Sequence, residues 1–365
     1  MVQMEHPEND PRYAGLKVNE GVAKQPMVSP YFKRRVRKEL SVPEYVDAII
    51  HGNRTFLSQA VTLVESTLPE HQEKAQAIIE GCLPYSGRSM RIGITGVPGA
   101  GKSTSIDAFG MHLVKQGRRL AVLAIDPSSE VSKGSILGDK TRMERLSREL
   151  NAFIRPSAAG NSLGGVARKT RETIVLCEAA GFDTVFVETV GVGQSETAVH
   201  SMVDFFLLIQ LAGTGDELQG IKRGIMEMAD GIIINKADGD NIDRANLAAS
   251  HFRNALHLFP ETASGWEPKV LTYSGYYGIG IKDIFDMIDK YRHFTQESGY
   301  FEANRRRQAK YWMYEAVNDA LRSSFYGNVG VKDLTQAVEA QVLENKITPF
   351  VGAHRLLEAY YESFK

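Results

Sequence analysis

A short glycine-rich segment that ends in lysine and serine has the residue types and spacing needed to bind phosphate. It matches G-x-x-x-x-G-K-[ST] and reads Gly96-Val97-Pro98-Gly99-Ala100-Gly101-Lys102-Ser103. Glycines let successive backbone N–H groups approach an anion closely, and the lysine ammonium reaches the β- and γ-phosphates. The serine hydroxyl is a suitable ligand for Mg²⁺ beside those phosphates. These residues, with Thr104 next in the chain, are therefore predicted to bind a nucleoside triphosphate.

The residues on either side supply the elements that such a loop needs. Arg91–Thr95 predicts a short buried strand, and Thr104–Gln116 predicts a helix that Gly117 ends. The N-terminus of that helix favours the negative charge of a phosphate. A chance glycine turn before a helix is the alternative, but the strand–loop–helix order favours a phosphate-binding loop.

A second motif indicates which base the nucleotide carries. Asn235-Lys236-Ala237-Asp238 follows the apolar run Gly231–Ile234, and N-K-x-D at the end of a strand is typical of guanine recognition. The Asp238 carboxylate can accept hydrogen bonds from both N1–H and the N2 amine of guanine. Adenine would leave that carboxylate unpaired, which costs several kcal/mol, or roughly 10³-fold in affinity. A polar turn is the alternative, but the motif's place after a phosphate-binding loop favours guanine contacts by Asn235, Lys236 and Asp238.

Three acids are candidate Mg²⁺ ligands. Glu188 ends the predicted strand Phe182–Glu188. At the end of this strand, P-loop NTPases carry an acid that holds the metal directly or through water. Gly191 follows it and would let a backbone N–H approach the γ-phosphate. Asp126 follows another strand, and Asp139 lies further on in a polar segment. From the pattern alone, each of these two aspartates is either a Mg²⁺ ligand or a helix cap.

Four longer blocks, in the same order, carry a resemblance to one family. They are Asp126–Ser129, Gly134–Met143, Val187–Glu196 and Gly215–Lys222. With the motifs above, they make the chain resemble the methylmalonyl-CoA mutase-associated GTPases over roughly residues 40 to 325. Members of that family are chaperones of adenosylcobalamin-dependent mutases.

The resemblance implies a metal site, a switch and a partner. Ser103, Asp126, Asp139 and Glu188 would surround Mg²⁺, with GTP or GDP as the nucleotide. The segment Gly213–Lys222 would be a third switch that couples the nucleotide to the mutase, with Gln219 or Lys222 entering the catalytic site beside Lys102 and Glu188. Intrinsic hydrolysis would be slow and stimulated by the partner.

One loop departs from the family pattern. The last base-contacting loop usually reads Ser-Ala, whereas this chain has Tyr273-Ser274-Gly275. The backbone contact of Ser274 and Gly275 to guanine O6 is expected to survive the change.

Strands and helices alternate between these motifs, which predicts an α/β P-loop NTPase with a mostly parallel sheet covered by helices on both faces. Seven strands are expected, centred on Ile92–Thr95, Leu120–Ile125, Ala152–Arg155, Val185–Glu188, Phe205–Gln210, Gly231–Ile234 and Val270–Tyr273. All motifs then lie at the carboxyl ends of the strands, where ligands bind. A capping box at Ser41-Val42-Pro43-Glu44 predicts a helix that continues to about Val64.

The expected organisation has four parts. They are an extended arm (1–40), a helical segment (41–89), the GTPase domain (90–292) and a C-terminal helical extension (293–365). Because the extension is too small for a core of its own, it must pack on something, and a homodimer is expected.

Composition narrows the possible partners. With 43 basic and 44 acidic side chains the net charge is −1, so no basic field predicts nucleic-acid or membrane binding. No apolar run reaches 18 residues, and the two cysteines, Cys82 and Cys177, suggest structural thiols in a reducing compartment. The expected location is the cytoplasm.

Three functions fit these motifs to different degrees. The first is a GTPase that gates cofactor loading and protection of an adenosylcobalamin-dependent acyl-CoA mutase, methylmalonyl-CoA mutase by default. The alternative is a nickel-insertion accessory GTPase, which the nine scattered histidines and two cysteines argue against. A kinase is disfavoured because kinases rarely read guanine.

Overall fold

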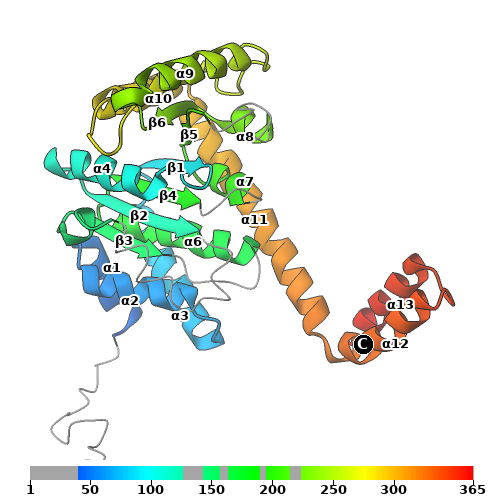
Figure 1. Ribbon diagram of the computed structural model, residues 1–365. Coiled ribbons are helices and arrows are strands. Elements are labelled where there is room, and N and C mark those ends of the chain that lie inside the picture. The colour runs from blue at the N-terminus through cyan, green and yellow to red at the C-terminus, as the bar shows by residue number, and fades with distance from the viewer. Residues whose placement is uncertain (1–39, 126–142, 157–162, 190–194, 214–222, 365) are drawn as a thin grey trace, which may run out of the picture. The chain divides into compact units, whose positions relative to one another are not determined.

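The computed structural model describes residues 40–125, 143–156, 163–189, 195–213 and 223–364 (Figure 1). Residues 41–365 form one compact unit. Its centre is a seven-stranded sheet in the order β3-β2-β4-β1-β5-β6-β7, in which every neighbouring pair is parallel. The strands are β1 (Met90–Gly96), β2 (Leu120–Ile125), β3 (Ala152–Pro156), β4 (Thr184–Thr189), β5 (Phe205–Leu211), β6 (Gly231–Asn235) and β7 (Lys269–Thr272). The predicted fold class and all seven predicted strands are confirmed.

Helices cover both faces of this sheet, and further helices extend away from it. The helices of the described residues are α1 (Val42–Ile50), α2 (Arg54–Glu65), α3 (Pro69–Cys82), α4 (Lys102–Lys115), α6 (Leu163–Ala179), α7 (Ser195–His200), α8 (Arg223–Met228), α9 (Ile242–Leu256), α10 (Ile281–Glu297), α11 (Tyr300–Gly327), α12 (Val329–Leu343) and α13 (Pro349–Glu362). The crossover from β1 to β2 runs one way across the sheet and that from β3 to β4 runs the other way. Right-handed crossovers therefore place α4 and α6 on opposite faces.

Burial explains why the strands read as continuous apolar runs. Every residue of β1, β2, β4 and β6 is buried, as expected for a parallel sheet that helices cover on both faces. Phe109 of α4 and Phe285 of α10 pack edge to face, with ring centroids 5.8 Å apart. Because the strands are parallel, their carboxyl ends meet at one edge of the sheet, and the predicted motifs follow those ends.

The predicted helix from Ser41 to about Val64 is wrong in one respect, because the chain forms two helices there. The capping box at its start is present, and the Ser41 N–H donates to Glu44 Oε2 at 2.8 Å. Gly52 has a φ of +77°, which interrupts the helix. The Asn53 side chain then accepts hydrogen bonds from Thr55 N and Phe56 N and caps α2.

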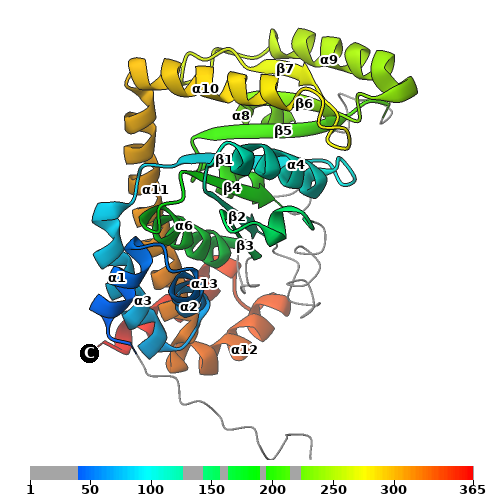
Figure 2. The same ribbon diagram turned by 90° about the vertical axis from the view of Figure 1, so that its left-hand side faces the viewer.

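The two ends of the described chain pack differently. Helices α1, α2 and α3 pack against one another and against α6 (Figure 2). Helix α11 contacts α6 and α10, and its far end meets α12, which pairs with α13. Among the described residues, no helix is both long and apolar enough to span a membrane.

Candidate functional site

The predicted phosphate-binding loop lies between β1 and α4. Gly96, Gly99 and Gly101 have φ values of +156°, +79° and +84°, which favour glycine. A Cβ on Gly96 would collide with the Ile209 carbonyl, and one on Gly101 would lie 2.7 Å from Asn235 Nδ2. At these two positions a side chain would collide with the neighbouring strands, so the loop conformation depends on glycine.

Lys102 and Ser103 begin helix α4 and point toward different partners. The Lys102 ammonium donates to the Gly96 carbonyl at 2.8 Å, while Ser103 Oγ donates to Glu188 Oε1 at 3.2 Å. Burial lowers the pKa of Lys102, and the charges of Glu188 and Glu196 act in the opposite direction. The lysine is thus held beside the loop, among acids that favour its positive charge.

Two of the four predicted metal ligands meet in the described part of the chain. Ser103 lies at the start of α4 and Glu188 in β4, and their side-chain oxygens are 3.2 Å apart. A hydroxyl with a carboxylate is a donor set that suits Mg²⁺. Asp126 and Asp139 lie outside the described residues, as do Gln219 and Lys222. Their predicted roles stay predictions.

The Asn235 side chain joins the phosphate loop to the predicted base-contacting loop. Its Nδ2 donates to the Ala100 carbonyl at 2.7 Å, and its Oδ1 accepts from the Gly275 N–H at 3.1 Å. Asn235 is 4 % exposed, so both contacts are shielded from water. One buried amide therefore sets the position of two loops that are far apart in the sequence.

The Asp238 carboxylate is held by the same loop. Asp238 Oδ2 accepts a hydrogen bond from the Ser274 hydroxyl, and the neighbouring Ala237 N–H donates to the Tyr273 carbonyl at 3.0 Å. Lys236 is exposed and has a φ of +61°. The chain thus brings the predicted base-contacting residues together beyond the ends of β6 and β7.

The remaining predicted contact and two unpredicted neighbours complete the site. Thr104 is exposed in the first turn of α4. Glu196 is fully buried at the start of α7, and its charge acts on the pKa of Lys102. Sequence reasoning did not single it out, although it is an acid only eight residues after Glu188. The contact between Tyr273 and Ser105 was also missed, because 168 residues separate the two.

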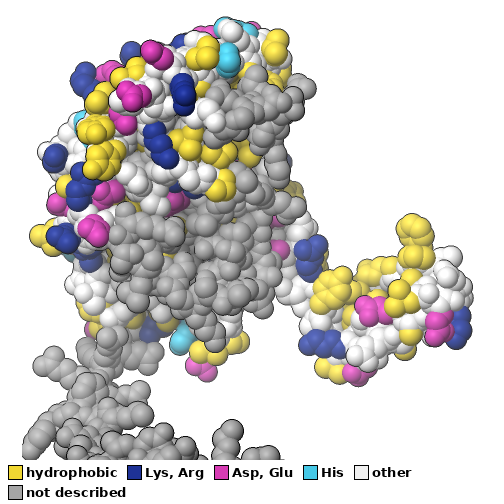
Figure 3. All heavy atoms as spheres, viewed as in Figure 1, with side chains coloured by type: hydrophobic (Ala, Val, Ile, Leu, Met, Phe, Trp, Pro, Cys, Tyr) yellow, Lys and Arg dark blue, Asp and Glu magenta, His cyan; other side chains and the backbone are white. Residues whose placement is uncertain are grey.

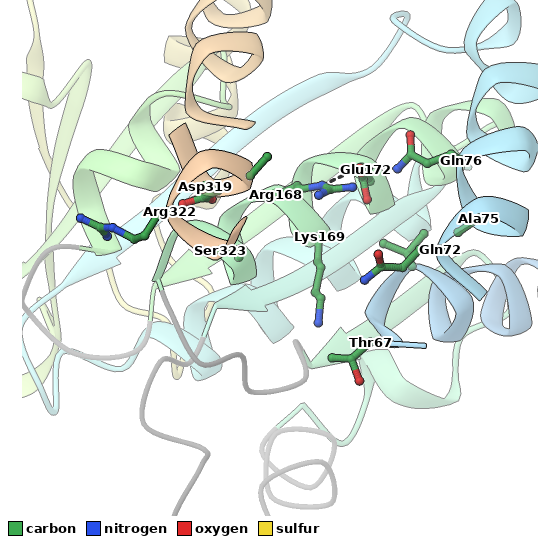
Figure 4. A pocket seen from close by; sticks show the side chains of 13 residues that line it. Thr67, Gln72, Ala75, Gln76, Arg168, Lys169, Glu172, Asp319, Arg322 and Ser323 are labelled. Atoms are coloured by element: carbon green, nitrogen blue, oxygen red, sulfur yellow. Dashed lines mark hydrogen bonds and ion pairs between the residues drawn. The ribbon is translucent and has the colours of Figure 1, made fainter. Parts of the chain in front are cut away.

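A pocket of about 590 Å³ lies outside the predicted nucleotide site, and Figure 4 shows the side chains that line it. Residues of α2, α3, α6 and α11, with Thr67 between α2 and α3, form its walls. Glu172 accepts from Gln76 at 2.7 Å and pairs with Arg168 at 3.1 Å. The pocket shares no residue with the loops described above.

Comparison with protein families gives a match over most of the chain. Residues 57–329 match the family described as methylmalonyl Co-A mutase-associated GTPase MeaB. A probable GTPase of Mycobacterium tuberculosis is 49% identical over 311 residues, which cover 85% of this chain and 93% of that protein.

Two further relatives and one solved structure agree. GTPase ArgK of Escherichia coli is 43% identical, covering 88% of this chain and 97% of its own. The mitochondrial methylmalonic aciduria type A homolog of Mus musculus is 42% identical, covering 89% and 80%. The crystal structure of a protein titled LAO/AO transport system kinase has a TM-score of 0.70 and 38% identity, covering 87% of this chain and 96% of that one.

Proposed function

This chain belongs to the family of methylmalonyl-CoA mutase-associated GTPases, and from that premise we propose that it is a chaperone that gates cofactor loading of an adenosylcobalamin-dependent acyl-CoA mutase. It would also protect that mutase. The observation that carries the nucleotide part of the proposal is the Asn235 side chain, which ties the phosphate loop to the loop that holds Asp238. That contact supports the proposal that the glycine loop and the Asp238 carboxylate bind one nucleotide.

Each group in the site has a proposed task. Lys102 neutralises the β- and γ-phosphates, and the backbone N–H groups of the glycine loop hold them in place. Ser103 and Glu188 would hold Mg²⁺, which supplies charge neutralisation of the phosphates when it is bound. Asp238 accepts hydrogen bonds from the guanine N1–H and N2 amine, and the backbone of the loop at Ser274 and Gly275 contacts O6. The adjacent Ser103 and Glu188 oxygens support the metal assignment.

The catalytic rate is proposed to depend on the partner. Phosphoryl transfer needs a group that positions the attacking water in addition to charge neutralisation. We assign this task to Gln219 or Lys222, which enter the site when the mutase binds. Basal GTP hydrolysis is then slow, and the bound mutase stimulates it.

The client is proposed to be methylmalonyl-CoA mutase. The family is described as associated with that enzyme, and a relative is named for methylmalonic aciduria. The same family membership makes the nickel-insertion alternative less favourable.

A homodimer is proposed through the C-terminal helices. Large apolar side chains are exposed there, including Leu321 of α11 at 58 %, Phe350 of α13 at 88 % and Tyr361 of α13 at 62 %. Figure 3 shows hydrophobic side chains gathered on the surface of these helices. A second copy of the chain would cover them. Light scattering should then give about twice the 40.4 kDa of one chain, and Phe350→Asp should shift the mass toward one chain.

The test of the proposed function is GTP hydrolysis with and without purified methylmalonyl-CoA mutase. We expect the mutase to raise the rate by roughly tenfold or more, which corresponds to about 1.4 kcal/mol in the barrier. Lys102→Ala should abolish the stimulated rate. Lys115→Ala, which changes an exposed lysine on the same helix, is the matched control and should leave it unchanged. A basal rate equal to the stimulated rate would contradict the gating role.

A further inference from the structure

The Tyr273 side chain lies between the helix that follows the phosphate loop and the loop that faces the base. Tyr273 is 1 % exposed, and its ring centroid is 5.5 Å from that of Phe109 on α4. Its hydroxyl is hydrogen-bonded to Ser105, also on α4. A tyrosine at this position therefore spans from one nucleotide-binding loop to the other.

The direction of the hydrogen bonds follows from the number of protons. Ser105 Oγ donates to the Gly101 carbonyl at 2.8 Å, and a serine hydroxyl has a single proton to donate. The Tyr273 hydroxyl must then be the donor in its bond to Ser105. Burial raises the pKa of Tyr273, so the phenol keeps its proton. The result is a relay from Tyr273 through Ser105 to the phosphate loop.

Gly275 leaves the space that this relay needs. A Cβ at this position would lie 3.2 Å from Tyr273 Oη, 3.5 Å from Asn235 Oδ1 and 3.6 Å from Ser105 Oγ. The first of these distances is tighter than an ordinary van der Waals contact. An alanine at position 275 therefore requires the Tyr273 hydroxyl or the loop itself to shift by a few tenths of an ångström.

Tyr273 is held in place by the burial of its side chain and by its backbone hydrogen bonds. Its N–H donates to the Ile234 carbonyl at 2.9 Å, and its carbonyl accepts from Ala237 N at 3.0 Å. These backbone bonds hold it to β6 and to the loop that carries Asp238. An added methyl group at Gly275 would therefore displace its own loop, including the N–H that donates to Asn235 and the Ser274 hydroxyl that donates to Asp238.

We propose that Tyr273 and Gly275 are a matched pair of positioning residues that sets the placement of the guanine-reading loop against the phosphate loop. The pair acts on base selectivity through the Ser274–Asp238 and Gly275–Asn235 contacts. This inference rests on the guanine site of the proposed function. It adds two residues to that site that do not themselves read the base.

The test is a double-mutant cycle of Tyr273→Phe and Gly275→Ala, read by the affinities for GDP and IDP. IDP lacks the 2-amino group from which Asp238 is proposed to accept a hydrogen bond. The ratio of the two affinities therefore reports the placement of that carboxylate. We expect Gly275→Ala to weaken GDP binding about tenfold and to lower the GDP-over-IDP preference, since it displaces about one hydrogen bond. Removing the Tyr273 hydroxyl in the double variant should restore both quantities to within about threefold of the wild type.

Two comparisons keep a folding defect separate from the proposal. Tyr273→Phe alone adds no volume and breaks the relay, so it should weaken GDP binding about threefold. Tyr276→Phe removes an exposed hydroxyl from the same loop and should change nothing. Gly275→Ala with wild-type GDP affinity and selectivity, or no recovery in the double variant, would overturn the pair. A wild-type protein that binds ADP as tightly as GDP would overturn the guanine site itself.

Discussion

The two edges of the central sheet use buried polar groups in opposite ways. At the amino edge, Arg91 at the start of β1 donates to both oxygens of Glu178 at 2.8 Å. Beside it, Arg305 of α11 donates to both oxygens of Asp204 at 2.8 and 2.7 Å. At the carboxyl edge, hydrogen bonds of the uncharged Asn235 and Ser274 side chains hold the loops, and Lys102, Glu188 and Asp238 are proposed to bind the nucleotide.

The charged groups at the two edges have different tasks. Those at the amino edge stabilise the fold, and those at the carboxyl edge are proposed to bind a ligand. Burial alone would raise the pKa of Glu178, but its bonds to Arg91 outweigh burial and lower it. Arg305 also donates to the Gly87 and Ser89 carbonyls, so it joins α11 to the start of β1. The charged groups of the amino edge are thus paired within the chain, whereas those of the carboxyl edge are proposed to bind phosphate, metal and base.

The largest expected effect comes from removing one ion pair of the amino edge. Arg305→Ala leaves the Asp204 carboxylate buried without its guanidinium, which should lower the free energy of unfolding by about 3–5 kcal/mol. Arg306→Ala, which changes the exposed neighbour on the same helix, should cost well under about 1 kcal/mol. Urea unfolding of both variants measures the difference. Equal stability of the two would show that the amino edge does not depend on this ion pair.

Asp230 sharpens the comparison, because it is an amino-edge acid held by the Phe206 amide and the Tyr291 hydroxyl instead of by a guanidinium. Burial raises the pKa of Asp230 to about 7. Its contribution to stability is therefore fully present below its unfolded pKa of about 4 and is lost as the pH rises through about 7.

The measurement for Asp230 is the free energy of unfolding from about pH 5 to pH 8, where this group should remove on the order of 3 kcal/mol. Asp230→Asn should lack that component, so its stability relative to wild type should increase with pH. Asp240→Asn, at an exposed site, should follow the wild-type curve. Parallel curves for wild type and Asp230→Asn would contradict the assignment.

At the carboxyl edge, removing a ligand-binding charge should change affinity and not stability. Asp238→Ala should reduce the preference for GDP over ADP by about 10²-fold, because it removes the acceptor of two guanine donors. Calorimetric titration with both nucleotides measures the preference, and Asp240→Ala serves as the control. If Asp238→Ala instead unfolds the protein and spares the preference, the two edges do not differ as described.

The smallest expected effect concerns a group that positions another. Ser274→Ala removes the hydroxyl that donates to Asp238, so GDP affinity should fall by about fivefold, or about 1 kcal/mol. The free energy of unfolding without nucleotide should change by less than the effect of Arg305→Ala. A Ser274→Ala variant with wild-type GDP affinity would show that Asp238 needs no such support.

The sequence predicted features that depend on neighbouring residues and missed contacts between residues far apart in the chain. The seven strands and the two nucleotide motifs were found because their signals lie in short runs of neighbouring residues. The pairing of Arg305 with Asp204 spans 101 residues and has no local signal. The break at Gly52 was missed because the apolar spacing continues across it and a single glycine gives a weak signal.

The structure shows where part of the predicted site lies, while the binding roles stay predictions. Ser103 and Glu188 lie side by side, and Asn235 contacts both the glycine loop and the loop at Gly275. The departure from Ser-Ala at Ser274 and Gly275 was visible in the sequence, but its cause was not. The pairing proposed above would account for it, because a Cβ at position 275 would lie 3.2 Å from Tyr273 Oη, a contact visible only once the residue after β7 is placed beside α4.

We propose that the carboxyl edge of the sheet binds a guanine nucleotide, while the charged groups of the amino edge are paired within the chain. Hydrogen exchange of the full chain, with and without GDP and Mg²⁺, tests it most directly. The account predicts added protection at residues 96–104, 235–238 and 273–275, and unchanged exchange at residues 87–91 and 201–205. Unchanged exchange at 235–238, or equal protection of both edges, would contradict it.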